Sequence, residues 1–236
     1  MNFKNLAIIL MAVTPIVAQA DETPITVTAD VPFFNKYVWR GVNLLNDPVL
    51  QPSINLAFQG WNLNFWGDYD INNAKQFDEF DVTVSYTGDL PQGSWTAGYI
   101  DYAFPGSSVS HTREIYGNFT FAQDYSPYVQ LNFDSDEVDG LYARFGAQRA
   151  ISTAAGDINV HGWFGYGDKN MNNALYGNNK VGLADFGLEA TYSKQLSQNA
   201  TGYVKLGYTA LLDKNHLSGA PNRNNVTFGF GIGLGF

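Results

Sequence analysis

The sequence contains no cysteine, which excludes a disulfide-stabilised scaffold and any metal site built on thiolates. Charged side chains make up only 15% of the chain, whereas the surface of a soluble domain usually carries more charge. No stretch after residue 20 has 18 consecutive apolar residues, so no membrane-spanning helix is expected there. If this part of the chain enters a membrane, it must do so as strands of a closed barrel.

The first residues have the pattern of an export signal. Lys4 precedes an apolar run of about a dozen residues, and Ala-Gln-Ala precedes Asp21. We therefore expect residues 1–20 to be a signal peptide that is cleaved after Ala20. Residues 21–236 are then expected to form one domain, because all-β barrels are commonly of this length.

Apolar and polar residues alternate along most of the remaining chain, as they do in strands with two different faces. The stretch WNLNFWGDY places Trp61, Leu63 and Phe65 on one face and Asn62 and Asn64 on the other. No stretch after the signal peptide shows a convincing helical repeat. The pattern predicts twelve strands, over residues 25–43, 48–58, 61–70, 77–87, 94–103, 112–122, 127–135, 140–150, 157–167, 183–195, 200–212 and 223–236.

We expect an all-β fold, namely a transmembrane antiparallel up-and-down β-barrel of twelve strands, with ten or fourteen as alternative counts. The rival interpretation is a soluble periplasmic sandwich or jelly roll, which would also alternate. The apolar faces favour the barrel, because they are unusually aromatic and many end in rings suited to the membrane boundaries. The candidate boundary rings are Trp61, Tyr69, Tyr86, Trp95, Tyr192 and Tyr208.

The connections between the predicted strands alternate in length. They are short after even-numbered strands and tend to be longer and more polar after odd-numbered strands, with 44–47 and 135–139 as short exceptions. Outer-membrane barrels have this asymmetry, with short periplasmic turns and longer extracellular loops. An even strand number places both termini on the periplasmic side. The loop at 168–185 is long enough to fold over or into the barrel mouth and to gate it.

The last predicted strand has large apolar side chains on one face and mostly glycine on the other. Thr227, Gly229, Gly231, Gly233 and Gly235 alternate with large apolar residues. A face that meets lipid needs no polar partner, so this strand is expected to close the barrel. Its terminal aromatic predicts the barrel-assembly machinery as a partner. The residues of this assembly signal are Phe228, Phe230, Ile232, Leu234 and Phe236.

The segment at 36–70 resembles the start of the proteobacterial Gcw_chp family. The likeness rests on a Y-x-W-R-G sequence, a Q-P-S sequence and a Trp-rich strand, and its residues are Tyr37, Trp39, Arg40, Gly41, Gln51, Pro52 and Trp66. Weaker similarity extends over most of the chain after the signal peptide. The resemblance implies an outer-membrane barrel of a Gram-negative bacterium, and it provides no catalytic residue.

The polar face of the predicted strands must point into the barrel. Arg or Lys turned toward lipid at mid-depth would cost about 2–4 kcal/mol, so the strand phase and the energy agree. A barrel of twelve strands lies between small filled barrels and open porins. The lumen is therefore either plugged by paired charges or a narrow pore, and the mixed signs favour a polar or zwitterionic solute. The candidate lumen-lining residues are Arg40, Trp66, Asp68, Asp81, Glu114, Tyr116, Asp134, Tyr142, Arg144, His161, Trp163, Glu189, Tyr203 and Lys205.

Catalytic and metal-binding chemistry is weakly indicated. The acidic run from Asp134 to Asp139 fails the order of a calcium-binding loop, since Phe145 stands where that loop needs glutamate. His111 follows Ser110, but adjacent residues of a strand point to opposite faces, so the pair is a weak nucleophile–base candidate. His161 is expected in the lumen as a hydrogen-bonded polar residue. We therefore predict no catalytic residue, no metal site and no cofactor.

Three functions follow from this reading. The first is a narrow outer-membrane channel for passive passage of a small hydrophilic solute. The second is a non-conducting barrel that serves structure, adhesion or lipopolysaccharide contact through its loops. The third is a lipid-modifying enzyme centred on a histidine. Expected partners are the lipid and lipopolysaccharide of the outer membrane, and no nucleic acid is expected, because a chain with a net charge of −9 is a poor partner for it.

Overall fold

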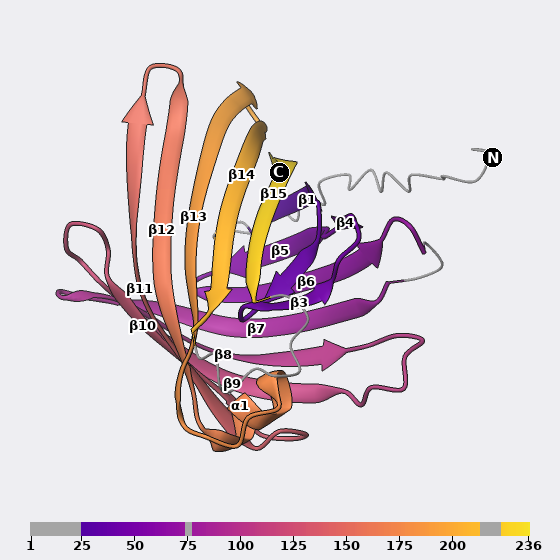
Figure 1. Ribbon diagram of the computed structural model, residues 1–236. Coiled ribbons are helices and arrows are strands. Elements are labelled where there is room, and N and C mark those ends of the chain that lie inside the picture. The colour runs from indigo at the N-terminus through magenta and orange to yellow at the C-terminus, as the bar shows by residue number, and fades with distance from the viewer. Residues whose placement is uncertain (1–24, 74–76, 213–222) are drawn as a thin grey trace.

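The computed structural model of the protein describes residues 25–73, 77–212 and 223–236. The predicted signal peptide at 1–20 and the imidazole of His216 lie outside the described residues. The chain forms a closed antiparallel barrel with twelve strand positions, as predicted (Figure 1). The ring closes where β1 (Thr26–Phe34) pairs with β15 (Asn224–Gly235).

Ten of the predicted strands match the structure within three residues at each end, so the two-residue period alone located most of the wall. Neighbouring strands in sequence are neighbours in the barrel, which is the up-and-down order. Between β1 and β15 the wall is completed by β4 (Val49–Leu50), β5 (Ser53–Phe58), β6 (Trp61–Asp70), β7 (Glu79–Leu90), β8 (Gly93–Ala103), β9 (Thr112–Phe121), β10 (Tyr128–Asp134), β11 (Gly140–Thr153), β12 (Gly156–Gly167), β13 (Gly182–Ser197) and β14 (Ala200–Leu211).

The two ends of the barrel differ in their connections. We call one end the turn end, because its strands are joined by the short segments 59–60, 91–92, 122–127, 154–155 and 198–199. The opposite long-loop end carries the connections 35–48, 71–78, 104–111, 135–139, 168–181 and 212–223. Phe236 N donates to Val27 O at the turn end, so the described parts of both chain ends meet there.

The outer surface of the wall is apolar. Leu206, Phe230 and Ile115 each keep more than half of their surface exposed, as a lipid-facing band requires. At the turn end, the rings of Trp61 and Tyr86 lie 5.2 Å apart, and the ring of Trp95 follows 5.7 Å from Tyr86. Three of the six rings that the sequence predicts for the membrane boundaries thus lie together at this end.

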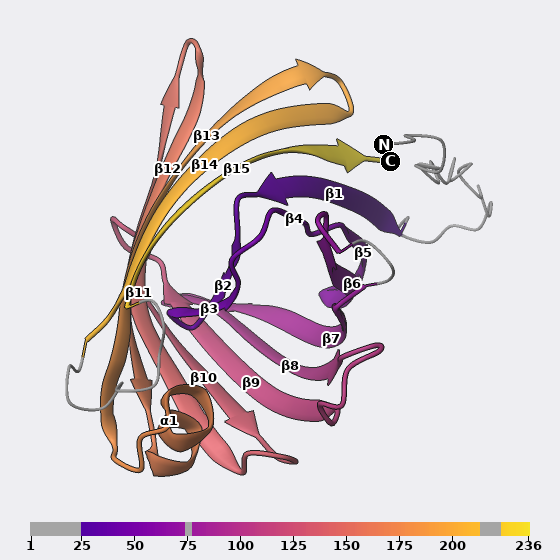
Figure 2. The same ribbon diagram turned by 45° about the vertical axis from the view of Figure 1, so that its right-hand side comes forward.

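The predicted single strand over 25–43 is wrong. β1 ends at Phe34, and the chain then turns into a hairpin of β2 (Tyr37–Trp39) and β3 (Val42–Leu45). Phe34 and Val49 are register partners in the wall, so residues 35–48 are the connection between two adjacent strands. The hairpin lies inside the ring of strands (Figure 2). Residues 44–47 are therefore not a loop of their own, and one of the two exceptions to the alternation disappears.

The second predicted strand, 48–58, is interrupted. β4 and β5 occupy one position in the wall, since both pair with β1 and with β6. The break falls at Gln51 and Pro52, where proline has no N–H to donate. Gly67 N donates to the Pro52 carbonyl, and Gln51 N donates to the Pro32 carbonyl, so the wall remains closed across the break.

The long loop at 168–185 contains a helix that the sequence pattern did not reveal. Helix α1 (Lys169–Tyr176) begins after Asp168, whose side chain accepts a hydrogen bond from Met171 N. It ends at Gly177, which has the left-handed φ of 67° that favours glycine. Among the described residues, no helix is both long and apolar enough to cross a membrane.

Candidate functional site

The tip of the β2–β3 hairpin is a tight turn at Arg40 and Gly41. Trp39 and Val42 are paired, and the two residues between them have φ of 47° and 78°. Positive φ at both central positions is the geometry of a type I′ turn, which matches the twist of a two-residue hairpin. The turn carries the Arg40 side chain deep into the lumen, where only 4% of it remains exposed.

An ion pair fixes this tip to the opposite wall. Arg40 Nη2 donates to Glu114 Oε2 on β9 at 2.7 Å. Tyr102 Oη and Asn132 Nδ2 donate to the same carboxylate oxygen at 3.0 and 2.9 Å. Burial by itself lowers the pKa of the Arg40 guanidinium, but the Glu114 carboxylate and the phenols of Tyr102 and Tyr142 together raise it above its ordinary value, so the group stays charged.

Aromatic rings enclose the same guanidinium. Its central carbon lies 4.2 Å from the ring of Trp39 and 4.4 Å from the ring of Tyr142. A cation over the face of an aromatic ring is stabilised, and more so where water is excluded. Together with Glu114, these rings compensate for removing the charge from water.

Helix α1 packs onto the hairpin tip. Tyr176 Oη donates to the Arg40 carbonyl at 2.8 Å, and Met171 Sδ lies 3.5 Å from Arg40 Nη1. Asn225 Nδ2 of β15 donates to the Gly41 carbonyl at 3.3 Å. Burial raises the pKa of the Tyr176 phenol well above its ordinary value, so the hydroxyl remains a donor. We call residues 35–48 and α1 together the plug.

The residues that carried the family resemblance meet in and beside this plug. The rings of Tyr37 and Trp66 lie 5.6 Å apart at its base. Gln51 Nε2 donates to Asp68 Oδ1 of β6 at 2.8 Å, next to the break in the wall. The short sequence motifs therefore specify one structure, a hairpin folded inward and the wall that receives it.

A second buried carboxylate lies beside the hairpin tip. Asp185 of β13 is fully buried and accepts hydrogen bonds from Tyr142 Oη at 2.7 Å and Trp163 Nε1 at 3.1 Å. The guanidinium of Arg144 lies over the Trp163 ring at 4.9 Å. Tyr142 thus connects the Arg40 and Asp185 clusters across the lumen.

A cavity of about 610 Å³ lies at the long-loop end, between the hairpin, α1 and the wall. We call it the mouth cavity. Trp39, Phe104, Leu44 and Leu175 supply part of its apolar lining. Among the described residues, no lysine, arginine or histidine lines it. The carboxylates that line it are Asp68, Asp70, Asp78, Glu79, Glu114, Asp134 and Glu137.

The lumen at the turn end is polar and of mixed charge. One cavity of about 340 Å³ is lined by Arg144, His161 and Tyr116 among others. Another, of about 470 Å³, is lined by Asp30 and Tyr203, whose hydroxyl donates to Asp30 Oδ2 at 2.7 Å. Here the chain presents hydroxyls and amides, in contrast to the acidic mouth.

The glycine face of β15 allows aromatic rings to pack against part of the strand and leaves the rest of it uncovered. A side chain at Gly229 would collide with the ring of Phe34, and one at Gly231 would collide with the ring of Tyr203. A Cβ added at Gly233 would lie 3.9 Å from the nearest atoms, and a Cβ added at Gly235 would have no atom within 4 Å. The bare face thus makes room for two rings near mid-strand and leaves the turn end clear.

All fourteen candidate lumen residues are buried or half-buried in the structure, and Arg40 lies at the tip of the plug. The structure joins some of them in pairs, such as Arg40 with Glu114 and Lys205 with Glu189 at 3.2 Å. That they line an open passage stays a prediction. Residues that sequence reasoning missed are Tyr37, Trp39, Tyr102, Asn132, Met171, Tyr176 and Asp185.

The two described histidines have partners that do not form a catalytic set. His161 shares a hydrogen bond with Tyr128 Oη at 3.0 Å and stacks on Trp163 at 4.8 Å. His111 Nδ1 lies 3.5 Å from Asp101 at an exposed position. Among residues 25–73, 77–212 and 223–236, no serine hydroxyl is hydrogen-bonded to either ring.

The acidic segment after β10 is organised by its own hydrogen bonds. Asp134 Oδ1 accepts from Asp136 N at 3.0 Å and from Val138 N at 3.1 Å, and its other oxygen accepts from Thr112 Oγ1. Across the described part of the chain, no group of three or more histidine, aspartate or glutamate side chains could hold a metal ion.

Residues 18–192 match the model of a family described as a bacterial protein of unknown function, Gcw_chp. The chain belongs to this family. No curated protein sequence matches it.

Solved structures with a similar fold are outer-membrane β-barrels. The NanC porin and the KdgM porin, the latter in complex with disordered oligogalacturonate, are each 12% identical to the chain, with TM-scores of 0.56 and 0.55. Each comparison covers 89% of this chain and 99% of the other. An outer-membrane channel from Pseudomonas putida F1 is 10% identical, with a TM-score of 0.52 over 95% of this chain and all of that one. At these identities the likeness shows the fold.

Proposed function

We propose that this family member is an outer-membrane channel for small solutes that carry positive charge or none, and that the plug gates it at the extracellular mouth. The mouth cavity carries the proposal, because it joins a solute-sized volume inside the barrel to a lining of one charge sign. The long-loop end is assigned to the cell exterior because outer-membrane barrels keep their long loops there. The porin-like fold of the barrel supports a channel.

The charge distribution narrows the expected charge of the solute. Carboxylates in a cleft with low-dielectric walls concentrate cations and repel anions. Arg40 offsets only one of these carboxylates, Glu114, and Lys205 is paired with Glu189, so six other carboxylates remain in the lining of the mouth cavity. Arg144 lines a cavity at the turn end. We therefore prefer a cationic or neutral solute to the zwitterionic one that the mixed signs first suggested.

An acidic solute fits this mouth poorly. The oligogalacturonate named with the KdgM porin carries carboxylates, and those would meet the acidic lining of the mouth cavity here. Aromatic faces such as Trp39 add a favourable surface for an organic cation. The shared barrel fold is therefore no reason to expect that this chain binds the same ligand.

Gating is assigned to two segments that touch each other. The predicted gate at 168–185 contributes helix α1, and the hairpin at 35–48 contributes the part that reaches the far wall. Tyr176 joins the two through the Arg40 carbonyl. An opening movement must therefore break the Arg40–Glu114 pair, displace α1, or both.

Ion selectivity in planar lipid bilayers tests the proposal. Under a potassium chloride gradient, the zero-current potential should show a cation preference. Replacing two exposed members of the mouth cavity, Asp78→Asn with Glu137→Gln, should reduce that preference. Asp136→Asn is the matched control, because Asp136 pairs with Arg113 outside the cavity. An anion preference, or a double variant with unchanged selectivity, would contradict the proposed solute class, and a barrel that never conducts would favour the structural alternative.

A further inference from the structure

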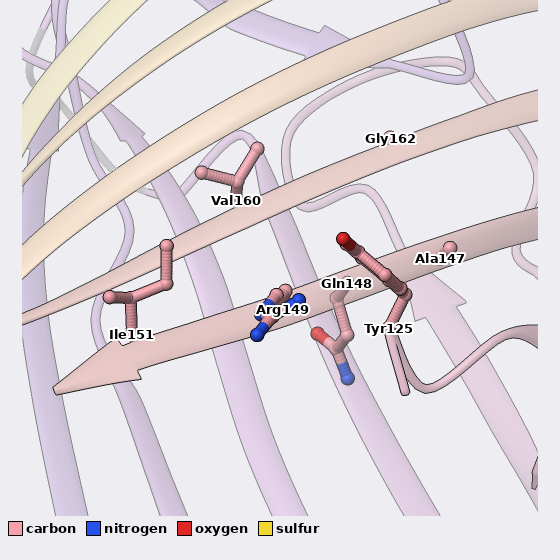
Figure 3. Close-up of a pocket in the computed structure, with 7 residues that line it drawn as sticks. All are labelled: Tyr125, Ala147, Gln148, Arg149, Ile151, Val160 and Gly162. Carbon is pink, nitrogen blue, oxygen red and sulfur yellow. The ribbon is translucent and has the colours of Figure 1, made fainter. Parts of the chain in front are cut away.

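The lipid-facing surface has a groove near the turn end of β11 and β12 (Figure 3). Its volume is about 470 Å³. Ala147 and Gly162 are register partners on these strands and form the floor. Phe145 and Phe164 form the next outward pair on one side, and Val160 begins the bulky surface on the other. Two small residues between larger ones thus leave a dent in the apolar band.

Arg149 stands at the edge of this dent. It follows Ala147 on the outward face of β11, and its central carbon lies 4.7 Å from the ring of Tyr125. Tyr125 is held in place because Gln148 N donates to its carbonyl at 2.8 Å. Within the described residues, no carboxylate forms an ion pair with Arg149. The barrel therefore presents an exposed guanidinium to the membrane with only an aromatic face beside it.

A guanidinium beside lipid is best satisfied by an anion with oxygen acceptors. Arginine suits phosphate, since its planar fork donates two parallel hydrogen bonds. The apolar dent next to it, with Ile151 and Val160 along its sides, offers a surface for a hydrocarbon chain. A glycerophospholipid carries both of these chemical features in one molecule.

We propose that this groove binds one glycerophospholipid, with its phosphate on Arg149 and part of an acyl chain over Ala147 and Gly162. The turn end faces the periplasm if the long loops face outward, so the lipid belongs to the inner leaflet. The site lies on the outside of the barrel, and it requires only that the barrel is inserted in a membrane. It is independent of whether the lumen conducts.

Native mass spectrometry of bound lipid tests the site. The barrel is inserted into phosphatidylcholine vesicles that contain phosphatidylglycerol and diacylglycerol, and it is then extracted into mild detergent. The wild-type protein should retain one phospholipid in preference to diacylglycerol, which has no phosphate. Arg149→Gln should reduce phospholipid retention about tenfold, as expected for losing hydrogen bonds to a charged group.

A second variant tests the dent without changing charge. Gly162→Leu fills the floor, and a Cβ there would lie 3.7 Å from its nearest neighbours, so the wall should tolerate it. It should also lower phospholipid retention. Lys194→Gln is the control, because Lys194 is another exposed basic residue near the turn end that does not line the groove.

Two results would overturn the proposal. One is equal phospholipid retention by the wild-type protein and Arg149→Gln. The other is an equal loss in Lys194→Gln, which would indicate only general attraction between basic residues and anionic lipid. The altered gel migration of a folded barrel before boiling shows that each variant has folded. If Gly162→Leu fails this check, Ala147→Leu fills the same floor from the other strand.

Discussion

Replacing Glu114 with glutamine should release the plug while leaving the barrel intact. The substitution keeps the shape of the side chain and removes the charge that faces Arg40. The two side chains are 2.7 Å apart, with exposures of 4% and 1%. At an effective dielectric constant near 20, two unit charges at this distance attract by about 6 kcal/mol. Most of that attraction offsets the cost of removing both charges from water.

Removing one partner costs more free energy than the intact ion pair contributes to stability, because the other charge is then buried without a partner. Removing one member of a buried ion pair costs about 3–5 kcal/mol. The wall is held by strand pairing around the whole ring, so this cost should appear as displacement of the hairpin. The population of the displaced state should rise by between about two and four orders of magnitude.

A thiol-labelling assay can measure this displacement, because the chain has no native cysteine. Met171 is 1% exposed against the hairpin tip, so Met171→Cys places a single reporter inside the plug, between α1 and the hairpin. A polar maleimide should label it slowly in the otherwise unchanged protein. Adding Glu114→Gln should raise the labelling rate by about tenfold or more, even if part of the effect is lost to relaxation.

The control uses the same substitution in another ion pair of the lumen. Glu189 pairs with Lys205 at 3.2 Å, and both side chains are more than a quarter exposed. This pair does not include a plug residue, so Glu189→Gln should leave the labelling rate unchanged. An unchanged rate in Glu114→Gln, or an equal rise in both variants, would refute the role of the Arg40–Glu114 pair as the latch.

Two further predictions concern the plug tip and the closing strand. Gly41→Ala should cost about 1–3 kcal/mol and speed labelling in the same assay, because Gly41 has a φ of 78° and an added Cβ would lie 2.8 Å from Asp185 Cβ. Gly233→Ala should have no such effect, since its nearest neighbours would be 3.9 Å away, and equal rates in the two variants would argue against a strained tip. Deleting Phe236 should lower the amount of barrel assembled in outer membranes while refolding of the purified chain in detergent stays unchanged, because the exposed ring belongs to the proposed assembly signal. Normal assembly of the variant that lacks Phe236 would show that this residue is not needed as an assembly signal.

The wall could be predicted because each strand must separate lipid from lumen. The two-residue period predicts β6 over 61–70, as the structure has it, and predicts the bounds of β11 to β14 within three residues. The period does not show where a strand leaves the wall. Tyr37 and Trp39 keep the phase of β1, yet they lie inside the barrel. The usable signal was Arg40-Gly41, a pair suited to a tight turn.

The site depended on contacts that no local pattern encodes. Arg40 and Glu114 are 74 positions apart, and their pairing follows only from the barrel closing around the hairpin. Helix α1 is short and mostly polar, so its repeat was too weak to detect. Its cap residues, Asp168 and Gly177, were visible in the sequence and would have marked its two ends.

Single-channel conductance of a barrel that lacks the hairpin of the plug tests the central claim most directly. Phe34 and Val49 are register partners, so deleting residues 36–47 and replacing Pro48→Gly leaves Asn-Gly as a two-residue turn, the preferred sequence for a tight hairpin. The wild-type barrel should show small or intermittent currents, and the deletion variant should show a larger and steady conductance. Equal conductance in the two barrels, or none in either, would contradict a channel gated by this plug.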